Sequence, residues 1–320
     1  MSELVAGVDL GGTTISAALA ERDGTVVVED ELPTEAYRGP EHVLLRIGDL
    51  IERLSSRAGQ RPIALGMGCP GLVDLQRGVT RFFPNLPTQW RDVPVADRLR
   101  MRLGCPVFLL NDVRTATLGE LTYGQGRTVQ TMAFFSLGTG VGGGLVIDGK
   151  LRLGPFGSAG EIGHQTILPN GPLCGCGNYG CLEALVSGPA LVGEAVRLML
   201  AGQAPKLFAL TEGDPGRISP KEIAVAARDG DAGAQHVIDR AAEYLGIGVA
   251  NVVTTIHPEL VVLGGGVSAL GDLLLEPVRR IMRDRVHMFP PDDVRVECSA
   301  LGDRAGVLGA VALAERESRK

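Results

Sequence analysis

The chain has 320 residues, of which 45% are hydrophobic, 21% charged and 4% aromatic, and its net charge is −6. This composition is that of a folded protein rather than a disordered one, and the length suffices for about two domains. A protein that binds nucleic acid is expected to carry a basic stripe or stacking aromatic side chains, so the acidic balance disfavours that class of partner.

The N-terminal sequence MSELVAGVDLGG lacks the basic region of a signal peptide and reaches Asp9 before any long apolar run. The longest apolar stretch, around residues 245–256, is also shorter than the ~20 residues that span a bilayer. We therefore expect a cytoplasmic protein with no membrane partner. In that reducing setting, clustered cysteines favour a metal site over disulfides.

The first part of the chain alternates strands with helices. Apolar runs predict strands, the dipeptide Asp23-Gly24 predicts a hairpin turn, and spacing of three to four residues predicts helices. A Pro/Gly loop, GCPGLVD, separates two of these elements. In chain order, we expect strands at 5–9 and 15–19 followed by a hairpin, a helix at 41–58, a strand at 63–67, a strand PVFLLND that stops at Asn111-Asp112, and the helix VRTATLGELTYG.

The second part repeats this pattern without repeating its letters. TMAFFSLGTGVGGGLVIDGKLRLG again predicts a strand, a glycine turn, a strand and a hairpin, which indicates two related α/β halves. Residues 203–220 have mixed polarity with three prolines, and we expect an exposed loop there. The remaining expected elements are a long helix at 236–256, a strand and glycine turn in ELVVLGGGVS, and the closing helix AGVLGAVALAERE.

Two glycine-rich matches are rejected. Gly138-x-Gly140-x-x-Gly143 matches the dinucleotide-binding fingerprint, but that motif needs a following helix, and LVIDGK is typical of a strand and hairpin. The stretch from Gly144 to Lys150 imitates a phosphate loop. Leu151, however, stands where a magnesium-binding hydroxyl is required.

Three other glycine turns each follow an apolar strand. Backbone N–H groups in such turns can approach phosphate oxygens, although any one of these turns also fits an ordinary tight turn. Asp9 precedes the first turn, and its carboxylate would repel a phosphate unless a cation such as Mg²⁺ lay between them. The combination indicates phosphoryl transfer. The turns are Gly11-Gly12-Thr13-Thr14, Gly138-Thr139-Gly140 and Gly264-Gly265-Gly266.

The segment EIGHQTILPNGPLCGCGNYGCLEAL, residues 161–185, holds half of the six cysteines. One histidine and three cysteines supply the ligand types of a closed tetrahedral zinc site, whereas a disulfide would suit a secreted chain. An ion with no open position is structural, and it would fix the two glutamates that flank it. Each glutamate alone also fits a solvated surface charge. The expected ligands are His164, Cys174, Cys176 and Cys181, and the flanking acids are Glu161 and Glu183.

Asp112 ends an apolar strand and precedes a helix, which allows two interpretations. Aspartate is a favoured N-cap, so its role could be to begin the helix. Strand ends are also where α/β proteins place ligand groups. A carboxylate there can accept the proton of an attacking hydroxyl.

DLGGTT, SLGTGVGGG and VVLGGGV resemble the two phosphate motifs and the adenosine motif of actin-like sugar kinases. EIGH…CGCGNYGCLE resembles the signature of their ROK (repressor, open reading frame, kinase) branch, and the likeness is closest to the ROK glucokinases. The resemblance implies an α/β fold of two actin-like (ribonuclease H-like) domains with an interdomain active-site cleft. The expected domains are a smaller one of residues 1–112 plus 305–320 and a larger one of residues 113–304 that carries the zinc loop.

The resemblance further implies an ATP-dependent hexose kinase, most simply a glucokinase that makes glucose 6-phosphate, with structural Zn²⁺ and with Mg²⁺ bound alongside ATP. Asp112 is the implied catalytic base. The implied sugar-binding residues are Gly71, Asn85, Asn111, Asp112, Glu161, His164 and Glu183. The implied ATP-binding residues are Asp9, Gly11, Gly12, Thr13, Thr14, Gly138, Thr139, Gly140, Gly265 and Gly266.

Several alternatives stay open at this stage. The acceptor could be fructose, mannose or an N-acyl hexosamine, and polyphosphate could replace ATP. A sugar-responsive repressor is a second class, but only eight residues precede Asp9, so we expect no helix-turn-helix domain there. Thr14 stands where the family often has a lysine, which leaves the source of positive charge on the phosphates undecided. Family analogy also implies a homo-oligomer, a dimer or a tetramer.

Overall fold

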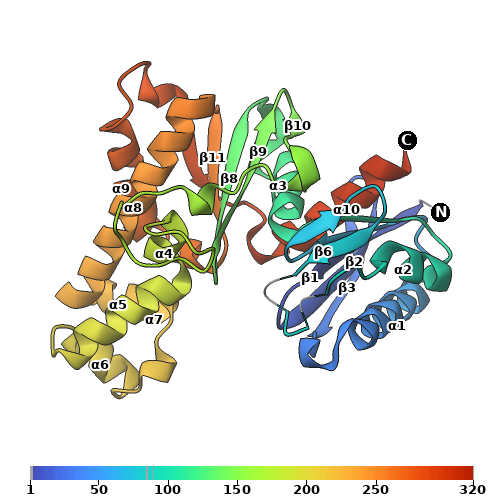
Figure 1. The fold of residues 1–320 in the computed structure, drawn as a ribbon, viewed down its shortest axis with the longest axis horizontal. Helices are drawn as coiled ribbons and strands as arrows, with labels where there is room; N and C mark the ends of the chain where they lie inside the picture. The colour runs from blue at the N-terminus through green and yellow to red at the C-terminus, as the bar shows by residue number, and fades with distance from the viewer. Residues whose placement is uncertain (1–2, 84–85, 89, 320) are drawn as a thin grey trace. The chain divides into compact units, whose positions relative to one another are not determined.

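The computed structural model describes residues 3–83, 86–88 and 90–319 (Figure 1). By its internal contacts the chain divides into two compact units. Residues 113–128, 150–159 and 300–304 group with the first unit, whereas the sequence placed them in the larger C-terminal domain. Which segments fold as domains stays a prediction. The first unit contains residues 1–128, 150–159 and 300–320, and the second contains residues 129–149 and 160–299.

The first unit is built on a five-stranded mixed sheet with the order β3-β2-β1-β4-β7. β1 pairs antiparallel with β2 and parallel with β4, and β4 pairs parallel with β7. The predicted strands and the hairpin at Gly24 are confirmed. The strands are β1 (Leu4–Leu10), β2 (Thr14–Glu21), β3 (Val26–Pro33), β4 (Leu65–Cys69) and β7 (Val107–Asn111), with a separate pair β5 (Leu72–Asp74) and β6 (Val79–Phe82).

Helices cover both faces of this sheet (Figure 1). Successive residues of a strand point to opposite faces, so β1 contributes to two cores. Ala6 and Val8 lie in the core that includes α1, while Val5 packs with Val311 of α10 on the other face. α3 lies against α10. These helices are α1 (Pro40–Ala58), α2 (Val95–Leu103), α3 (Asp112–Tyr123) and α10 (Ala305–Ser318).

The second unit repeats the plan of the first. Its sheet has the order β10-β9-β8-β11-β12, in which β8 pairs antiparallel with β9 and parallel with β11, and β11 pairs parallel with β12. The two related α/β halves expected from the sequence are therefore present. The strands are β8 (Met132–Leu137), β9 (Val141–Ile147), β10 (Lys150–Leu151), β11 (Leu260–Gly264) and β12 (Arg295–Cys298), of which β10 groups with the first unit.

Six helices accompany this second sheet in the described residues. The longest of them, α8, begins four residues before the predicted helix, where the side chain of Asp231 accepts a hydrogen bond from the N–H of Ala234. The helices are α4 (Leu182–Val186), α5 (Gly188–Leu200), α6 (Pro205–Thr211), α7 (Pro220–Arg228), α8 (Ala232–Ile256) and α9 (Asp272–Arg283).

The expectation of an exposed loop over residues 203–220 is wrong. The segment contains α6 and leads into α7. Pro205 and Pro220 each occupy the first position of a helix, where a backbone N–H has no partner within the helix. These prolines therefore begin helices rather than interrupt them. Leu207 and Ile218 are buried in the core of the unit. Burial of these two side chains outweighs the polar composition.

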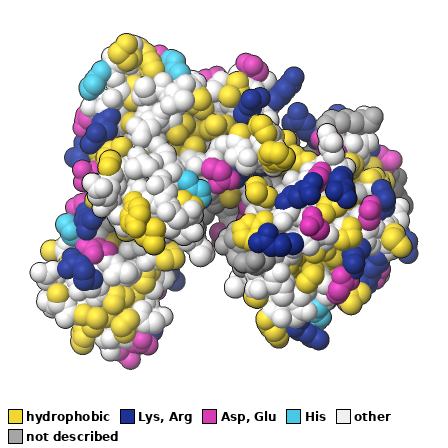
Figure 2. Space-filling view, in the orientation of Figure 1, with side chains coloured by type: hydrophobic (Ala, Val, Ile, Leu, Met, Phe, Trp, Pro, Cys, Tyr) yellow, Lys and Arg dark blue, Asp and Glu magenta, His cyan; other side chains and the backbone are white. Residues whose placement is uncertain are grey.

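Among the described residues, every helix is too short or too polar to cross a lipid bilayer. Figure 2 shows acidic and basic side chains interspersed over the first unit rather than gathered by sign. Ion pairs between α1 and α2 account for part of this mixture, for example Arg98 with Glu41 and Arg102 with Glu52.

Candidate functional site

Three neighbouring strands of the first unit bring together most of the catalytic and sugar-binding residues predicted there. Asp9 of β1 lies opposite Gly68 of β4, and Cys69 of β4 lies opposite Asn111 of β7. Because β1, β4 and β7 are parallel, their carboxyl ends meet at one edge of the sheet. Asp9 and Asp112 therefore lie near enough for the charge of Asp112 to act on Asp9.

Asn111, rather than Asp112, is the N-cap of α3. Its Oδ1 accepts from the backbone N–H groups of Val113 and Arg114 at 3.1 and 3.2 Å. Its Nδ2 donates to Asp112 Oδ1 at 2.8 Å and to the carbonyl of Gly71 at 3.2 Å. The capping interpretation of Asp112 is thus not needed, since its neighbour performs that role.

The two carboxylate oxygens of Asp112 have different surroundings. Oδ1 accepts from the N–H of Val113 and from Asn111 Nδ2, both at 2.8 Å. Within residues 3–83, 86–88 and 90–319, no hydrogen bond from another residue is directed at Oδ2. Oδ2 is therefore the oxygen of Asp112 left available for a further hydrogen bond.

Both carboxyl groups have raised pKa values. Burial raises the pKa of Asp112 to about 6, although the N–H of Val113 and the charge of Arg114 act in the opposite direction. Burial, together with the negative charge of Asp112, raises the pKa of Asp9 to about 7. A buried pair of carboxylates at a strand edge is a candidate functional site.

α10 closes one side of Asp9. Gly306 lies so near this carboxylate that a side chain there would collide with it, so only glycine fits at this position. Gly68 on β4 also lies beside Asp9, where a Cβ would come within 3.2 Å of Oδ1. The backbone of β4 and of α10 thus approaches Asp9 closely on two sides, and sequence alone gave no signal for Gly306.

The first glycine turn, between β1 and β2, is held by short hydrogen bonds. The N–H of Gly11 donates to the carbonyl of Thr14 at 2.9 Å, and Thr34 Oγ1 donates to the carbonyl of Gly11 at 2.8 Å. Gly12 and Thr13 between them are exposed. An anion can therefore approach the backbone of this turn.

The other two glycine turns lie side by side in the second unit. The N–H of Gly138 donates to the carbonyl of Gly140 at 2.9 Å, which closes the turn between β8 and β9. Gly265 has φ +83, and a Cβ there would come within 2.6 Å of the carbonyl of Leu137. Gly265 and Gly266 are exposed. The turns thus form one backbone-lined edge without charged side chains of their own.

The predicted zinc ligands converge in the second unit. Their four ligand atoms all lie within 4.8 Å of one another, and the three thiols are unpaired. His164 Nδ1 is 3.7 Å from Cys174 Sγ, and Cys176 Sγ is 3.7 Å from Cys181 Sγ. A tetrahedral zinc ion with bonds of about 2.0–2.3 Å holds its ligand atoms at about such separations. The chemistry of the four donors and their spacing therefore fit zinc.

The two acids beside this cluster have different surroundings. Glu183, on α4, accepts from the N–H of Val141 at 3.0 Å, directly after the Gly138–Gly140 turn. Glu161 is exposed, and its carboxylate lies 4.0 Å from His164 Nε2. His164 therefore directs Nδ1 toward the cysteines and Nε2 toward Glu161. The residues predicted for sugar and metal in this unit lie in one region.

Asn85 and Trp90 lie in the segment between β6 and α2. Asn85, a predicted sugar-binding residue, lies outside the described residues. Trp90, which the sequence favoured as a packing residue, is buried and stacks on Phe83 with ring centroids 5.5 Å apart.

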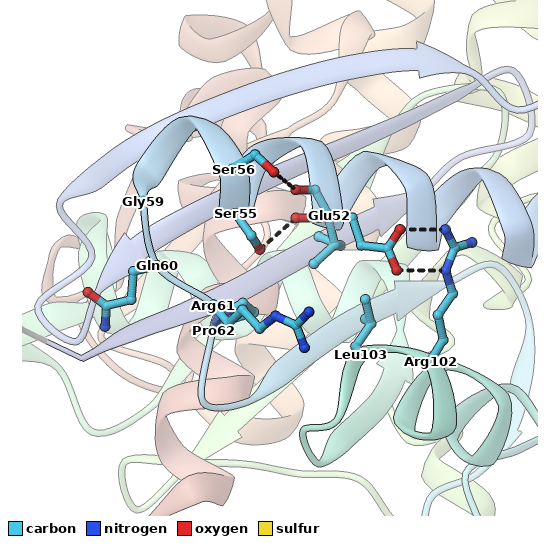
Figure 3. Close-up of a pocket in the computed structure, with 10 residues that line it drawn as sticks. Glu52, Ser55, Ser56, Gly59, Gln60, Arg61, Pro62, Arg102 and Leu103 are labelled. Atoms are coloured by element: carbon cyan, nitrogen blue, oxygen red, sulfur yellow. Dashed lines mark hydrogen bonds and ion pairs between the residues drawn. The ribbon is translucent and has the colours of Figure 1, made fainter.

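A cavity of about 520 Å³, drawn in Figure 3, belongs to the first unit but contains none of the predicted site residues. Its wall is formed by the ends of α1 and α2. Two of the charged side chains on it pair with each other, since Arg102 donates to both oxygens of Glu52 at 3.0 and 2.7 Å (Figure 3). Ser55 and Ser56 donate to carbonyls of their own helix. We assign no ligand to it.

Besides Gly306, a second residue of the site was missed in the sequence. Arg114 is buried beside Asp112 and donates to Asn111 Oδ1 at 3.1 Å. Arginine two positions into a helix is usually solvated, so nothing in the local sequence indicates its burial. The only available signal was its place two residues after Asp112, in a segment of small and apolar residues.

Comparison with known proteins agrees with this geometry. The model of the ROK family matches residues 5–317. The chain is 37% identical over 310 residues to a glucokinase of Thermotoga maritima, with 96% of each chain covered. It is 34% identical over 312 residues to a xylose repressor of Caldicellulosiruptor bescii, covering 97% of this chain and 77% of the repressor.

A solved structure shares the fold. The crystal structure of a ROK family glucokinase from Streptomyces griseus in complex with glucose and AMPPNP has a TM-score of 0.84 and 36% identity to this chain, covering 98% of this chain and 99% of that one. The predicted α/β class, with its two mixed five-stranded sheets, is confirmed. From the family match over residues 5–317 and these identities, the chain belongs to the ROK family.

Proposed function

We propose that the protein is an ATP-dependent hexose kinase and that glucose is its preferred acceptor, with glucose 6-phosphate and ADP as products. The observation that carries this proposal is Asp112, a carboxylate with one uncommitted oxygen at the strand edge of a chain related to glucokinases. The glucose and AMPPNP bound by the Streptomyces griseus relative support the choice of substrates.

In the proposed reaction Asp112 Oδ2 accepts the proton of the sugar 6-hydroxyl. The hydroxyl oxygen forms a bond to the γ-phosphorus, and the bond from that phosphorus to the β–γ bridging oxygen breaks, so ADP leaves with the electron pair. A pKa of about 6 suits this role, because the carboxylate is ionised at neutral pH and yet more basic than an exposed aspartate.

The sugar hydroxyls are proposed to be bound by the side chains of Glu161, His164 and Glu183, with Gly71 and Asn85 lining the sugar. Carboxylates and an imidazole can pair with neighbouring hydroxyls and discriminate strongly between sugars. Asn111 already uses its amide within the protein. We therefore propose that Asn111 acts chiefly by holding Asp112.

The three glycine turns are proposed to hold ATP through backbone N–H groups. Asp9 would hold Mg²⁺, which supplies positive charge to the phosphates when bound. Thr14 brings a hydroxyl and no charge to the first turn, so a magnesium ion beside Asp9 would supply the larger share of charge neutralisation there.

His164, Cys174, Cys176 and Cys181 are proposed to hold a structural zinc ion, which would keep the segment carrying Glu161 and Glu183 in one conformation. Metal analysis of freshly purified protein tests this: we expect one zinc per chain. Full activity without bound zinc would contradict it.

Steady-state phosphorylation rates across several hexoses and donors test the proposed function. The panel contains glucose, mannose, fructose and an N-acyl hexosamine, each with ATP and with polyphosphate. We expect the highest kcat/KM for glucose with ATP. A higher value for another hexose would reassign the substrate within the same enzyme class, and a higher value for polyphosphate would reassign the donor.

A sugar-responsive regulator is the second candidate function, favoured by the 34% identity to a xylose repressor. It predicts that sugar binds, as seen by calorimetry, while no sugar in the panel is phosphorylated. The presence of Asp9 and Asp112 at one strand edge favours the kinase. We also propose a homo-oligomer, which light scattering at working concentration would detect.

A further inference from the structure

Arg114 is a buried cation in the wall of the candidate site. Its side chain is 2% exposed. Because arginine is almost never buried without partners, its hydrogen bonds are informative. Nη1 donates to Asn111 Oδ1 at 3.1 Å. Nε and Nη2 donate to the carbonyl of Ala159 at 3.2 and 3.0 Å, and Nη2 also donates to the carbonyl of Ser158 at 3.2 Å. The planar fork thus joins the start of α3 to residues 158–159.

The hydrogen bond from Arg114 to Asn111 determines which way the amide of Asn111 faces Asp112. Asn111 Oδ1 accepts from Arg114 Nη1 and from two backbone N–H groups, so the oxygen of this amide must face them. Nδ2 then faces the other way, where it donates to Asp112 Oδ1 at 2.8 Å. Arg114 therefore fixes the orientation of an amide that in turn holds one oxygen of Asp112.

We propose that Arg114 is a positioning residue for the base of the phosphoryl transfer: acting through Asn111, it holds Asp112 with Oδ2 free for the substrate. This inference rests on the proposed function. Three titratable or charged groups face Asp112: its negative charge raises the pKa of Asp9 on β1 and of Cys69 on β4, and the charge of Arg114 on α3 lowers the pKa of Asp112 itself. Arg114 is the cation among these three groups, and it favours the ionised form of Asp112.

Two substitutions separate the charge from the hydrogen-bonding fork. Arg114→Met removes both, and we expect kcat to fall about 10–100-fold, as misplacement of a reacting group does. Removal of the positive charge also raises the pKa of Asp112, so the acidic limb of the pH–kcat profile moves to higher pH. Arg114→Lys keeps the charge and loses the fork. We expect it to lower kcat about tenfold and leave the acidic limb in place.

A double-mutant cycle tests the route through Asn111. Asn111→Ser retains an N-cap side chain but cannot bridge Arg114 and Asp112. If the two residues act as one unit, Arg114→Lys lowers kcat much less in the Asn111→Ser background than in the wild type. Strictly multiplicative effects would overturn the proposal. Arg279→Lys is the matched control, because Arg279 makes a comparable fork to Val296 and Glu297 in the second unit.

The remaining outcomes are decisive as well. A folded Arg114→Met with kcat within twofold of wild type and an unmoved acidic limb would overturn the positioning role. If Arg114→Met does not fold, the lysine variant decides by its kcat. Failure of both to fold would assign Arg114 a purely structural role. The proposed function is tested separately in the same assay, since wild-type protein that phosphorylates no hexose would remove it whatever the variants do.

Discussion

The two five-stranded sheets share one strand order but differ in the residues at the ends of matching strands. Asp9 stands two residues before the first glycine turn, and Ser136 stands two residues before the turn of the second unit. In both sheets the residue opposite on the next parallel strand is a glycine, Gly68 or Gly264. The same position thus carries a carboxylate in one half and a hydroxyl in the other.

This difference indicates that the two related sheets are suited to bind different groups. The strand edge of the first unit carries two carboxylates with raised pKa values, which suits proton and cation binding. The matching edge of the second unit is formed by glycine backbone, which suits an anion. The strand order sets where ligands can be bound, and the residues at the strand ends set which chemistry takes place there.

The largest expected effect concerns the carboxylate edge. Asp112→Asn keeps the size of the side chain but removes the base that we propose at Oδ2. We expect turnover to fall ~10²–10⁴-fold while ATP still binds. Measurement of kcat together with calorimetric binding of a non-hydrolysable ATP analogue checks both halves of this statement. Near-normal turnover would remove Asp112 from the mechanism.

A substitution in the glycine turns of the second unit should weaken ATP binding more than it lowers turnover. In Gly265→Ala the added Cβ would have to sit 2.6 Å from the carbonyl of Leu137 at a φ of +83. We expect ATP to bind about 10–100-fold more weakly, with the larger change in KM rather than kcat, since a ground-state contact is lost. Gly193→Ala is the control, because that glycine has open space around it in α5. Unchanged nucleotide affinity in Gly265→Ala would contradict the proposal that the glycine turns bind ATP.

Loss of zinc should act on the second unit alone. In Cys176→Ser, or after chelation, we expect amides of residues 164–181 to lose protection from hydrogen exchange while those of β1 and β4 keep theirs. Mass spectrometry of exchanged peptides checks the prediction. Equal protection with and without metal would show that the loop holds itself together.

The smallest expected effect is on stability. The pKa of Asp9 is raised from its ordinary 3.8 to about 7, so the folded protein binds this proton more tightly than the unfolded chain. The resulting stabilisation is complete at low pH and is lost as pH rises from about 4 through 7. Asp9→Asn should therefore raise Tm by a few degrees at pH 8 and by less at pH 5. Ser136→Ala, at the matched position, should show no such pH dependence.

Most of the fold was predictable because local rules and global packing agree. Buried strands such as 107–111 and the turn at Gly24 follow from apolar runs and turn chemistry. The repeat was also visible, since both halves place a glycine turn after the first apolar strand. The prediction of a loop over residues 203–220 was wrong because proline was taken as a residue that ends helices. Pro205 instead begins α6, and burial of Leu207 in the core stabilises that helix.

The site was predictable where chemistry is concentrated in short motifs. The cysteine spacing identified the cluster that the structure brings together. The sequence also singled out Asp9 and Asp112, each at the end of a strand, although it did not show that they lie near each other. Arg114 and Gly306 were not predictable, because each acts through contacts between segments far apart in the sequence. Which of Asn111 and Asp112 caps α3 also depended on side-chain geometry that residue type does not fix.

Product analysis of the wild-type protein with ATP and glucose tests the central claim most directly, namely that the protein transfers the γ-phosphate of ATP to a sugar hydroxyl. Phosphorus NMR of the reaction should show one hexose 6-phosphate formed for each ADP. ADP accompanied by inorganic phosphate, or no consumption of ATP with any hexose, would contradict the account.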